Sequence, residues 1–336
     1  MGVECWRGAA IRPPPRPSPF QGEGAVRTHP MTTLTPRLIT LLTLAPLLWA
    51  GNAVVGRLMV GQVPPLTLNF LRWTLTAVLL LPLAWRVLLQ WREVRLRWRY
   101  LLLISVLGVG LFNALQYTAL VTSTPLNITL VASSMPVWML AVGVLFFGEK
   151  PTARQLLGAG LGLAGVVLVI GRGSLQVLLS VQFVPGDLLI LLAAIGWAFY
   201  SWLLARPPAH MQGVQRPAWD WAAMVWIQAV FGLLAAGSFA TVEQVLGAAP
   251  IQWSVSVVAA LLYTAFGASI AAYRCWGLGV AEGGPQLAAV FNNLTPLFAA
   301  LLSMWLLDSR PEPYHLLAFA LIVAGIAVTS LGRRAQ

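Results

Sequence analysis

Residues 125–170 read PLNITLVASSMPVWMLAVGVLFFGEKPTARQLLGAGLGLAGVVLVI, and residues 285–330 read PQLAAVFNNLTPLFAALLSMWLLDSRPEPYHLLAFALIVAGIAVTS. The two stretches align without a gap when the chain is shifted by 160 residues. Proline and glycine then coincide in four pairs, which are Pro125 with Pro285, Pro136 with Pro296, Pro151 with Pro311, and Gly165 with Gly325. A fixed period of this kind indicates an internal repeat.

The composition indicates an integral membrane protein. Hydrophobic residues make up 58% of the chain, charged residues only 9%, and the mean hydropathy is +0.78. Soluble domains carry roughly 25% charged residues, so this chain cannot cover a surface that faces water. The net charge of +11 would suggest a nucleic-acid partner in a soluble protein. In a membrane protein the charge concerns orientation, and we expect the lipid bilayer and a small-molecule substrate as partners, with no nucleic acid.

Apolar stretches of about 20 residues, the length that crosses a bilayer, occur ten times. Their approximate limits are 38–60, 66–88, 100–121, 125–147, 153–171, 187–206, 219–240, 254–279, 284–307 and 313–332. The connecting segments are short and rich in proline and glycine, which leaves no room for a soluble domain. We therefore predict an all-α bundle of ten transmembrane helices.

The repeat divides these spans into two units of five, at 36–172 and 186–332. Five is odd, so the second unit enters the membrane from the side opposite to the first. This five-plus-five inverted-topology repeat is a common plan in secondary transporters, whose substrate site lies near the midplane where the halves meet.

The positions of arginine and lysine predict the orientation. With both termini in the cytoplasm, the cytoplasmic segments hold Arg37, Arg92, Arg95, Arg97, Arg99, Lys150, Arg154, Arg206, Arg216, Arg333 and Arg334. The opposite side holds only Arg57, Arg172 and Arg310. We expect a multi-pass protein of a bacterial-type cytoplasmic (inner) membrane.

Residues 1–35 differ from the rest, being rich in proline and arginine. They lack the apolar segment of a signal peptide. We expect a disordered tail, or an over-extended start with Met31 as the true initiator. Cys5 and Cys275 lie far apart, so neither a disulfide framework nor a metal site is expected. No cofactor is expected either.

Two segments carry a family resemblance: LLWAGNAVVGRLMVGQVPPLTLNFLRW in the first two spans and GEKPTARQLLGAGLGLAGVVLVI between spans four and five. Together with the ten-span plan, they make the chain resemble the drug/metabolite transporter superfamily, in particular its EamA-type exporters. The resemblance covers about residues 36–332. It implies export of amino acids or other small metabolites through a central cavity lined by both repeats, with peripheral fifth and tenth helices.

Charges deep inside the spans are limited to Arg72 and Arg274. An arginine at a helix centre costs about 2.5–3.5 kcal/mol on insertion scales. Arg72 should face the cavity or bond to a neighbouring carbonyl, the alternative being that it snorkels outward. Arg274 lies nearer a membrane edge, where snorkelling is favoured. The resemblance implies a fold-stabilising or carboxylate-binding role for Arg72.

No aspartate or glutamate lies deep in a span. Carriers coupled to protons or sodium usually use a carboxylate within the membrane. Uniport, facilitated export or exchange is therefore favoured, and a cationic substrate is disfavoured.

Neutral polar and aromatic residues cluster in spans one to four and six to nine, which predicts a shared polar interior. The candidate substrate-binding residues are Trp49, Asn52, Arg72, Asn113, Tyr117, Ser133, Ser134, Trp138, Trp197, Tyr200, Tyr273, Asn292 and Asn293. For any one of them, interhelical hydrogen bonding alone is the competing interpretation. Trp49, Trp138 and Trp197 could stack on an apolar or aromatic substrate.

Pro136 and Pro296 occupy equivalent positions in spans four and nine. Each removes a hydrogen bond to the carbonyl four residues back, at Ala132 and Asn292. At 1.5 Å per residue, Asn293 lies about 12 Å from the membrane edge, close to the midplane. We predict a helix-breaking gate at Pro136 and Pro296, with polar side chains facing the cavity. A kink that only shapes packing is the alternative.

Gly158 and Gly162 are spaced four apart in span five, which allows close helix packing. Packing within one chain is favoured over dimerisation, so we expect a monomer.

Other functions fit less well. An enzyme would need a nucleophile–base pair or a metal cluster, but the three histidines are scattered. A channel would need a continuous pore lining. Carriers of sugar phosphates, nucleotide sugars or drug-like compounds remain alternatives on the same scaffold, although the phosphorylated cargoes should demand several basic cavity residues.

Overall fold

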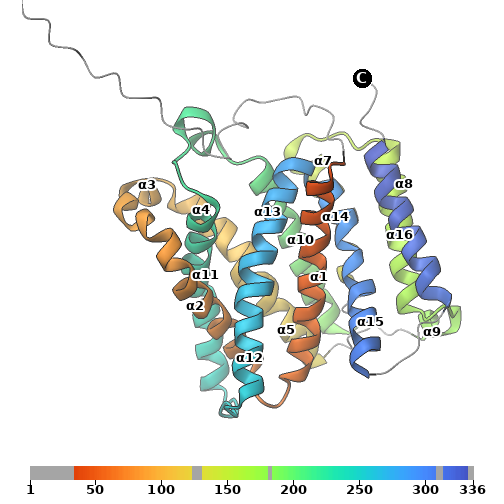
Figure 1. Ribbon diagram of the computed structural model, residues 1–336, viewed down its shortest axis with the longest axis horizontal. Coiled ribbons are helices and arrows are strands. Elements are labelled where there is room, and N and C mark those ends of the chain that lie inside the picture. Colours follow the sequence, from red (N-terminus) through yellow and green to blue (C-terminus); the bar gives the residue numbers. More distant parts are fainter. Residues whose placement is uncertain (1–33, 123–130, 181–183, 308–312, 332–336) are drawn as a thin grey trace, which may run out of the picture.

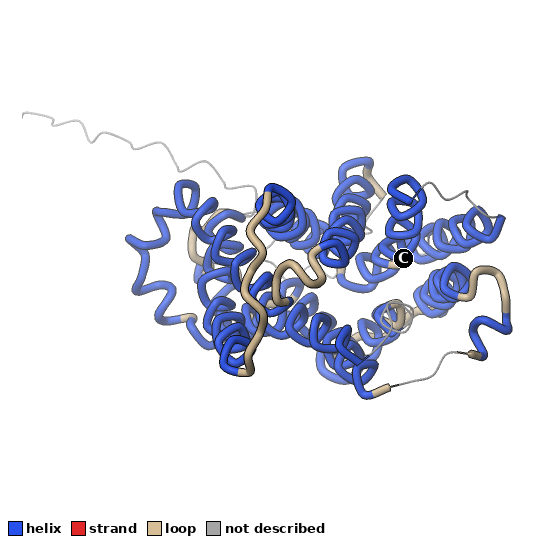
Figure 2. The backbone as a smooth tube through the Cα atoms, turned by 90° about the horizontal axis from the view of Figure 1, so that it is seen from below, coloured by secondary structure: helices blue, strands red, loops and turns tan. Residues whose placement is uncertain are grey.

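Helices make up all the regular structure that the computed structural model describes, which covers residues 34–122, 131–180, 184–307 and 313–331. The tube in Figure 2 shows helices and loops, with no strand in the part that is described. The N-terminal tail, including Met31, lies outside the described residues, as do the side chains of Arg57 and Tyr117.

The first half of the chain runs as a series of helices with a compact turn between the second and third spans. Its elements are α1 (Pro36–Leu58), α2 (Pro65–Ala84), η1 (Trp85–Gln90), α3 (Trp91–Leu96), α4 (Trp98–Ser105), η2 (Val106–Leu111), α5 (Phe112–Thr122), α7 (Met135–Phe147), α8 (Ala153–Ile170) and α9 (Leu175–Leu179). Of these, η2 is a π-helical segment that continues α4 into α5.

The second half follows the same order. Its elements are α10 (Pro185–Ala205), η3 (Ala209–Met211), η4 (Gly213–Gln215), α11 (Trp221–Val245), α12 (Val255–Tyr263), η5 (Thr264–Ala271), α13 (Ala272–Gly283), α14 (Pro285–Asn292), α15 (Leu294–Leu307) and α16 (Pro313–Leu331). The η5 segment is again π-helical and joins α12 to α13.

Among the residues that the structure describes, six helical stretches are long and apolar enough to cross a membrane. They are Pro36–Gly56, Pro65–Leu96, Trp98–Gln116, Pro185–Ala205, Trp221–Val245 and Val255–Gly283. Shorter apolar helices cover Met135–Phe147, Ala153–Leu168 and Pro313–Thr329. The stretch expected as span nine is divided at Asn293 into α14 and α15.

Helices at matching positions in the two halves make matching contacts. α1 packs on α13 and on α14 and α15, while α10 packs on α5 and on α7. α2 packs along α11, and α8 packs along α16. Figure 1 shows α8 and α16 side by side at one edge of the molecule, with α2 and α11 toward the other and α1, α10 and α13 between them. Each half thus contributes the same positions to the centre and to the edges.

Interruptions of helical geometry are also paired. The π-helical segments begin at Val106 and at Thr264, and new helices begin at Met135 and at Leu294. Because π-helical turns shift the hydrogen-bond register and leave backbone groups available, they occur often at functional sites.

Helix ends are satisfied by acidic and hydroxyl side chains. Asp220 accepts a hydrogen bond from the amide of Ala223 at 2.8 Å. Glu243, at the far end of α11, accepts from the amides of Leu66 and Thr67 at 2.9 and 2.7 Å. The carboxylate thereby caps α2 and ties the ends of α2 and α11 together.

Glycines allow α8 and α16 to touch backbone to backbone. A Cβ atom added to Gly325 would lie 2.7 Å from the carbonyl oxygen of Gly158 and 3.0 Å from the amide nitrogen of Gly162. A Cβ at Gly158 would lie 2.7 Å from the carbonyl oxygen of Gly325. The Gly158 and Gly162 face of α8 is therefore occupied by a helix of the same chain.

We expect Gly325→Ala to destabilise the protein by about 1–3 kcal/mol, the usual cost of inserting a methyl group into a packed interface. The neighbouring backbone cannot move aside as a flexible side chain could. The measurement is the thermal unfolding midpoint of the purified protein in detergent.

Gly160→Ala is the matched control, because a Cβ there meets nothing within 4 Å. This substitution should leave the midpoint unchanged or raise it, since alanine favours a helix by about 1 kcal/mol over glycine. Equal midpoints for the two variants would contradict the close-contact interpretation.

Candidate functional site

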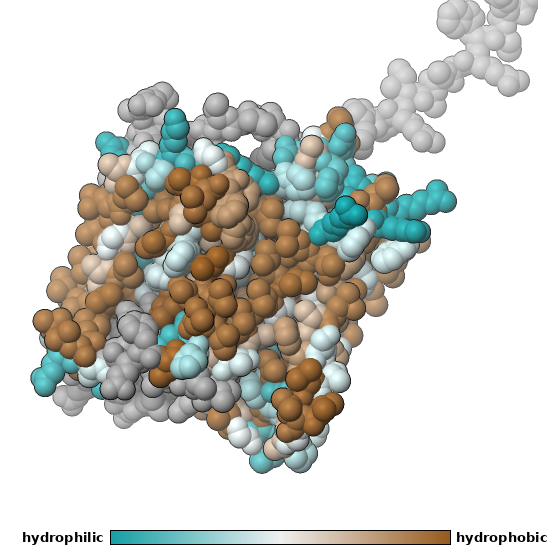
Figure 3. Space-filling model, turned by 180° about the vertical axis from the view of Figure 1, so that it is seen from behind, coloured by the Kyte–Doolittle hydropathy of each residue, from teal (hydrophilic) through white to brown (hydrophobic). Residues whose placement is uncertain are grey.

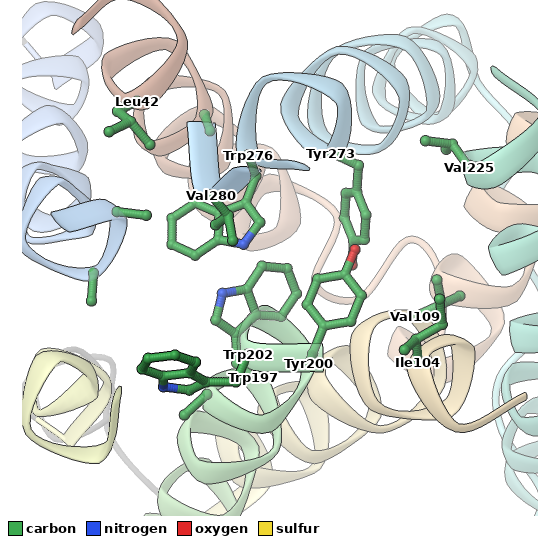
Figure 4. Close-up of a cluster of buried hydrophobic side chains, with 14 of the residues drawn as sticks. Leu42, Ile104, Val109, Trp197, Tyr200, Trp202, Val225, Tyr273, Trp276 and Val280 are labelled. Atoms are coloured by element: carbon green, nitrogen blue, oxygen red, sulfur yellow. The ribbon is translucent and has the colours of Figure 1, made fainter. Parts of the chain in front are cut away.

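Aromatic rings from three central helices meet in the middle of the bundle. Trp49 of α1 lies 5.2 Å from Trp197 of α10 and 5.3 Å from Trp276 of α13, measured between ring centroids. Trp197 also lies 4.9 Å from Tyr200 and 5.7 Å from Tyr273. Figure 4 shows the rings of α10 facing those of α13 across the space between the two helices. We call the rings of Trp49, Trp197, Tyr200, Tyr273 and Trp276 the aromatic centre.

Two further rings extend the aromatic centre. Trp73 of α2 contacts Tyr273 edge to face at 5.0 Å, and Phe112 of α5 lies 5.1 Å from Trp197. Edge-to-face pairs are worth about 0.5–1.5 kcal/mol beyond the area that they bury. Tyr200, Tyr273 and Trp197 are each at most 4% exposed, so side chains close the centre in this structure.

The polar atoms of these rings bond to neighbouring helices. The Trp49 indole donates to the carbonyl oxygen of Ala268 in η5 at 3.1 Å. The Tyr273 hydroxyl donates to the carbonyl oxygen of Gly108 in η2. The Tyr200 hydroxyl donates to Oε1 of Gln228 in α11 at 2.9 Å. Both π-helical segments therefore supply acceptors to the centre.

Arg72 of α2 lies beside this cluster and is 1% exposed. Its Nε donates to Oγ of Ser269 at 2.6 Å, and its two terminal nitrogens donate to Oδ1 of Asn113 at 3.5 Å and to the carbonyl oxygen of Ala268 at 3.3 Å. The guanidinium carbon also lies 5.1 Å from the Trp73 ring centroid. The hydrogen bonds of this buried cation thus go to neutral groups.

The carboxylates that the structure describes are engaged at helix ends, away from Arg72. Glu93 pairs with Arg97, Glu149 with Arg206, and Glu282 with Arg37, while Asp187, Asp220 and Glu243 accept from helix N-terminal amides. A guanidinium carries about five N–H donors, and Arg72 makes one hydrogen bond from each of its three nitrogens. The guanidinium therefore has remaining capacity for an anion.

Ser269 is held in place by the π-helical geometry of η5. Its hydroxyl donates to the carbonyl oxygen of Thr264, five residues earlier, at 2.9 Å. The Oγ lone pairs then face the Nε of Arg72. In the same segment, the carbonyl of Ala268 accepts from both Trp49 and Arg72. The η5 segment is therefore the structural support of the arginine.

The residues around the two interrupted helices form a second group. Nδ2 of Asn292 contacts Sδ of Met135 at 3.5 Å, which joins the end of α14 to the start of α7. Oγ of Ser134 donates to the carbonyl of Val131 at 2.6 Å and accepts from the Trp138 indole at 3.0 Å. Ser133 is buried nearby. Pro136 and Pro296 each lie in the first turn of the helix that follows the interruption.

Asn293 faces away from the aromatic centre. It is 1% exposed, and both polar atoms of its amide lack a hydrogen-bond partner. The amide rests against Gly162 of α8, where an added Cβ would lie 2.4 Å from its Nδ2. The absence of a side chain at Gly162 thus makes room for this amide.

The structure brings six of the residues singled out in the sequence together at the centre. These are Trp49, Arg72, Asn113, Trp197, Tyr200 and Tyr273. It places Ser133, Ser134, Trp138, Asn292 and Asn293 around the interruptions instead. Asn52, 9% exposed, lies one turn after Trp49 with an unpartnered Oδ1. The Tyr117 side chain lies outside the description.

Sequence reasoning missed Trp73, Trp276 and Ser269. Trp73 directly follows Arg72. Trp276 lies three residues after Tyr273, and this helical spacing could have drawn attention to Trp276. The alignment of Ser269 with Arg72 depends on the π-helical register and has no such signal.

Among the described residues, no three histidine, cysteine, aspartate or glutamate side chains gather closely enough to hold a metal ion. The centre therefore offers a cation, aromatic faces and neutral hydrogen-bonding groups. This combination suits binding of a small organic molecule with an anionic group and an apolar part.

We expect Ser269→Ala to destabilise the protein by about 1.5–3 kcal/mol, the usual contribution of a hydrogen bond to a charged group. The buried guanidinium would lose its shortest contact. Ser238→Ala is the control, because this exposed serine bonds only within its own helix, to the carbonyl of Leu234. Thermal unfolding midpoints in detergent measure both effects, and equal small shifts would contradict a supporting role for Ser269.

The chain is similar over most of its length to several known transporters. Over 292 residues the chain is 26% identical to an aromatic amino acid exporter, YddG, of Ancylobacter novellus, covering 85% of this chain and 94% of that protein. It is 27% identical over 304 residues to a probable amino-acid metabolite efflux pump of Escherichia coli K12, covering 88% and 95%. An uncharacterized transporter of Archaeoglobus fulgidus is 27% identical over 295 residues, with 86% and 96% covered.

A solved crystal structure matches the fold with a TM-score of 0.70 at 24% identity, covering 88% of this chain and 97% of that one. The model of the EamA-like transporter family matches residues 37–171 and again residues 184–331. These two matches together span nearly all the described residues. The chain belongs to the EamA-like transporter family.

Proposed function

We propose that this membrane transporter exports small organic metabolites that carry a carboxylate, with amino acids as the leading class. The observation that carries the proposal is the buried Arg72, bonded to neutral groups beside the aromatic centre. A substrate carboxylate would supply the anion that the guanidinium lacks, in the bidentate geometry that arginine favours.

The other chemistry of the centre suits a zwitterion. Oδ1 of Asn69, one turn before Arg72 on α2, is buried without a hydrogen-bond partner, as is Oδ1 of Asn52. Buried acceptors of this kind suit the ammonium group of an amino acid, since each unpartnered atom costs about 1–3 kcal/mol. The rings of Trp49 and Trp197 would take the apolar side chain.

The names of two relatives support this substrate class: one is a probable amino-acid metabolite efflux pump and the other an aromatic amino acid exporter. At 26–27% identity they support it only as a class. A phosphorylated cargo would bring two negative charges to a centre with one buried arginine, so we place it second.

The proposed architecture is ten transmembrane helices in two inverted halves, 36–172 and 186–332, with both termini in the cytoplasm of a bacterial-type inner membrane. Matched packing of α1 and α10, and paired interruptions in both halves, support the repeat. Alternating access would then exchange the roles of the two halves around the aromatic centre.

Transport would proceed by uniport or exchange. Coupling to protons or sodium usually relies on a carboxylate at membrane depth, and the sequence places none there. Trp197, Tyr200 and Tyr273 are buried in this structure, so their rings would have to separate to admit a substrate.

Transport of radiolabelled neutral amino acids by the purified protein in liposomes tests the proposal. Phenylalanine should be carried and phenylalanine amide should not, because the amide lacks the carboxylate. Arg72→Gln should lower the rate by about tenfold or more, since loss of one partner of a buried charge pair is costly. Arg72→Lys should retain part of it.

Arg274→Gln is the matched control, because this second arginine is exposed and stacks over Trp221 at 4.3 Å. It should keep the parental rate. Equal transport of phenylalanine and its amide would refute the carboxylate assignment, and transport of sugar phosphates alone would favour the second substrate class. Thermal unfolding midpoints separate loss of transport from loss of folding.

The paired interruptions give a separate prediction. Asn292→Ala combined with Asn293→Ala should abolish transport if the α14–α15 break is the moving part of the path. The thermal midpoint should stay level or rise, because Asn293 has an unpartnered buried amide whose removal costs little. Persistent transport in this double variant would mean that the break only shapes packing.

A further inference from the structure

Residues 85–99 form an elbow between α2 and α4, and its exposed surface is both apolar and basic. It comprises η1, α3 and the first residues of α4. Figure 1 shows α3 projecting from one end of the molecule, away from the aromatic centre. In Figure 3 hydrophilic side chains gather at that same end, on the right of the view, next to a broad apolar flank.

Exposed tryptophans and leucines alternate with exposed arginines along the elbow. The apolar members include Trp85, Leu88, Leu89, Trp91, Leu96 and Trp98, of which Leu89 and Leu96 are 76% and 75% exposed. The exposed arginines are Arg86, Arg92, Arg95 and Arg99. Arg86 and Arg99 lie over the rings of their tryptophan neighbours at 6.0 and 5.7 Å.

The charge of this exposed face is not compensated within the elbow. Its single acid, Glu93, is engaged by Arg97, which is 9% exposed and points inward. Arg97 also donates to the carbonyl oxygens of His210 and Gln215 at 3.0 and 2.6 Å. The other four arginines therefore present their charge outward.

The elbow is also anchored. Val87 and Val94 are buried at 3% and 2% exposure, and Oε1 of Gln90 accepts from the Trp219 indole at 2.8 Å. With Arg97, these contacts fix the segment to the loop between α10 and α11. Its exposed face is thus a preformed platform, so little conformational entropy would be lost when a ligand binds to it.

We propose that the elbow binds the headgroups of anionic phospholipids in the leaflet where it lies. Tryptophan and leucine side chains would enter the boundary between headgroups and acyl chains, where amphipathic segments with basic polar faces settle. The four arginines would contact lipid phosphates, for which guanidinium is well suited. Clusters of four to eight basic residues beside a membrane span attract anionic lipid. This site is independent of the substrate that is transported.

Native mass spectrometry of the full-length protein in detergent, with added phosphatidylglycerol or phosphatidylcholine, tests this proposal. Phosphatidylglycerol should bind more tightly, and its advantage should shrink as salt rises, because exposed charges are screened. Arg92→Gln/Arg95→Gln/Arg99→Gln should weaken phosphatidylglycerol binding by about tenfold or more. The corresponding triple lysine variant, which keeps the charge, should retain the binding.

The matched control, Lys150→Gln/Arg154→Gln/Arg172→Gln, removes the same charge from exposed positions elsewhere. It should leave phosphatidylglycerol affinity within about twofold, because these three residues lie outside the elbow. Equal binding of the two lipids, equal loss in both glutamine variants, or displacement of the lipid by inorganic phosphate alone would each overturn the assignment. The wild-type lipid preference and its salt dependence decide the matter even if a variant fails to fold.

Discussion

A guanidinium without water must find hydrogen-bond acceptors, and the centre of this protein is organised around that requirement. Arg72 reaches Ser269 and the carbonyl of Ala268, both in the π-helical η5 segment, and Asn113 beside η2. A regular α-helix would use its carbonyls internally. The π-helical turn makes an acceptor available and also turns the serine toward the arginine, so the irregular backbone and the buried charge depend on each other.

Most hydrogen bonds at the centre join one half of the chain to the other. Trp49 and Arg72 donate to η5 of the second half, Tyr273 donates to η2 of the first half, and Tyr263 donates to the carbonyl of Leu48 at 3.0 Å. At the edge, by contrast, α8 and α16 are in direct backbone contact at their glycines. On the proposed function, polar contacts at the centre would be exchanged for contacts to a substrate, whereas the glycine contact leaves no room for rearrangement.

The sequence predicted the helical class, the positions of the long spans and much of the centre. Apolar length located α1, α2, α10 and α11 to within a few residues, because span length follows from bilayer thickness. Trp49, Tyr200 and Tyr273 were found because polar and aromatic residues within apolar helices are costly unless they meet. Trp73 and Trp276 could not be separated from the other tryptophans of a chain that holds 15. The direction of Asn293 depends on the missing side chain of Gly162, a contact between distant spans that no local pattern reveals.

If the protein works by alternating access, the helix interruptions and the hydrogen bonds at the centre limit how it can move. Breaking the bonds to η2 and η5 at once would leave several buried polar groups unpaired, each at a cost of about 1–3 kcal/mol. A motion that keeps those bonds and bends the helices at Ser134 and Asn293 avoids that cost, because both interruptions already lack regular helical geometry. Substrate binding to Arg72 would lower the cost of the alternative, since a carboxylate replaces the neutral acceptors that the arginine gives up. On the proposed function, the buried arginine would act both as the binding group and as the contact whose exchange allows the two halves to separate.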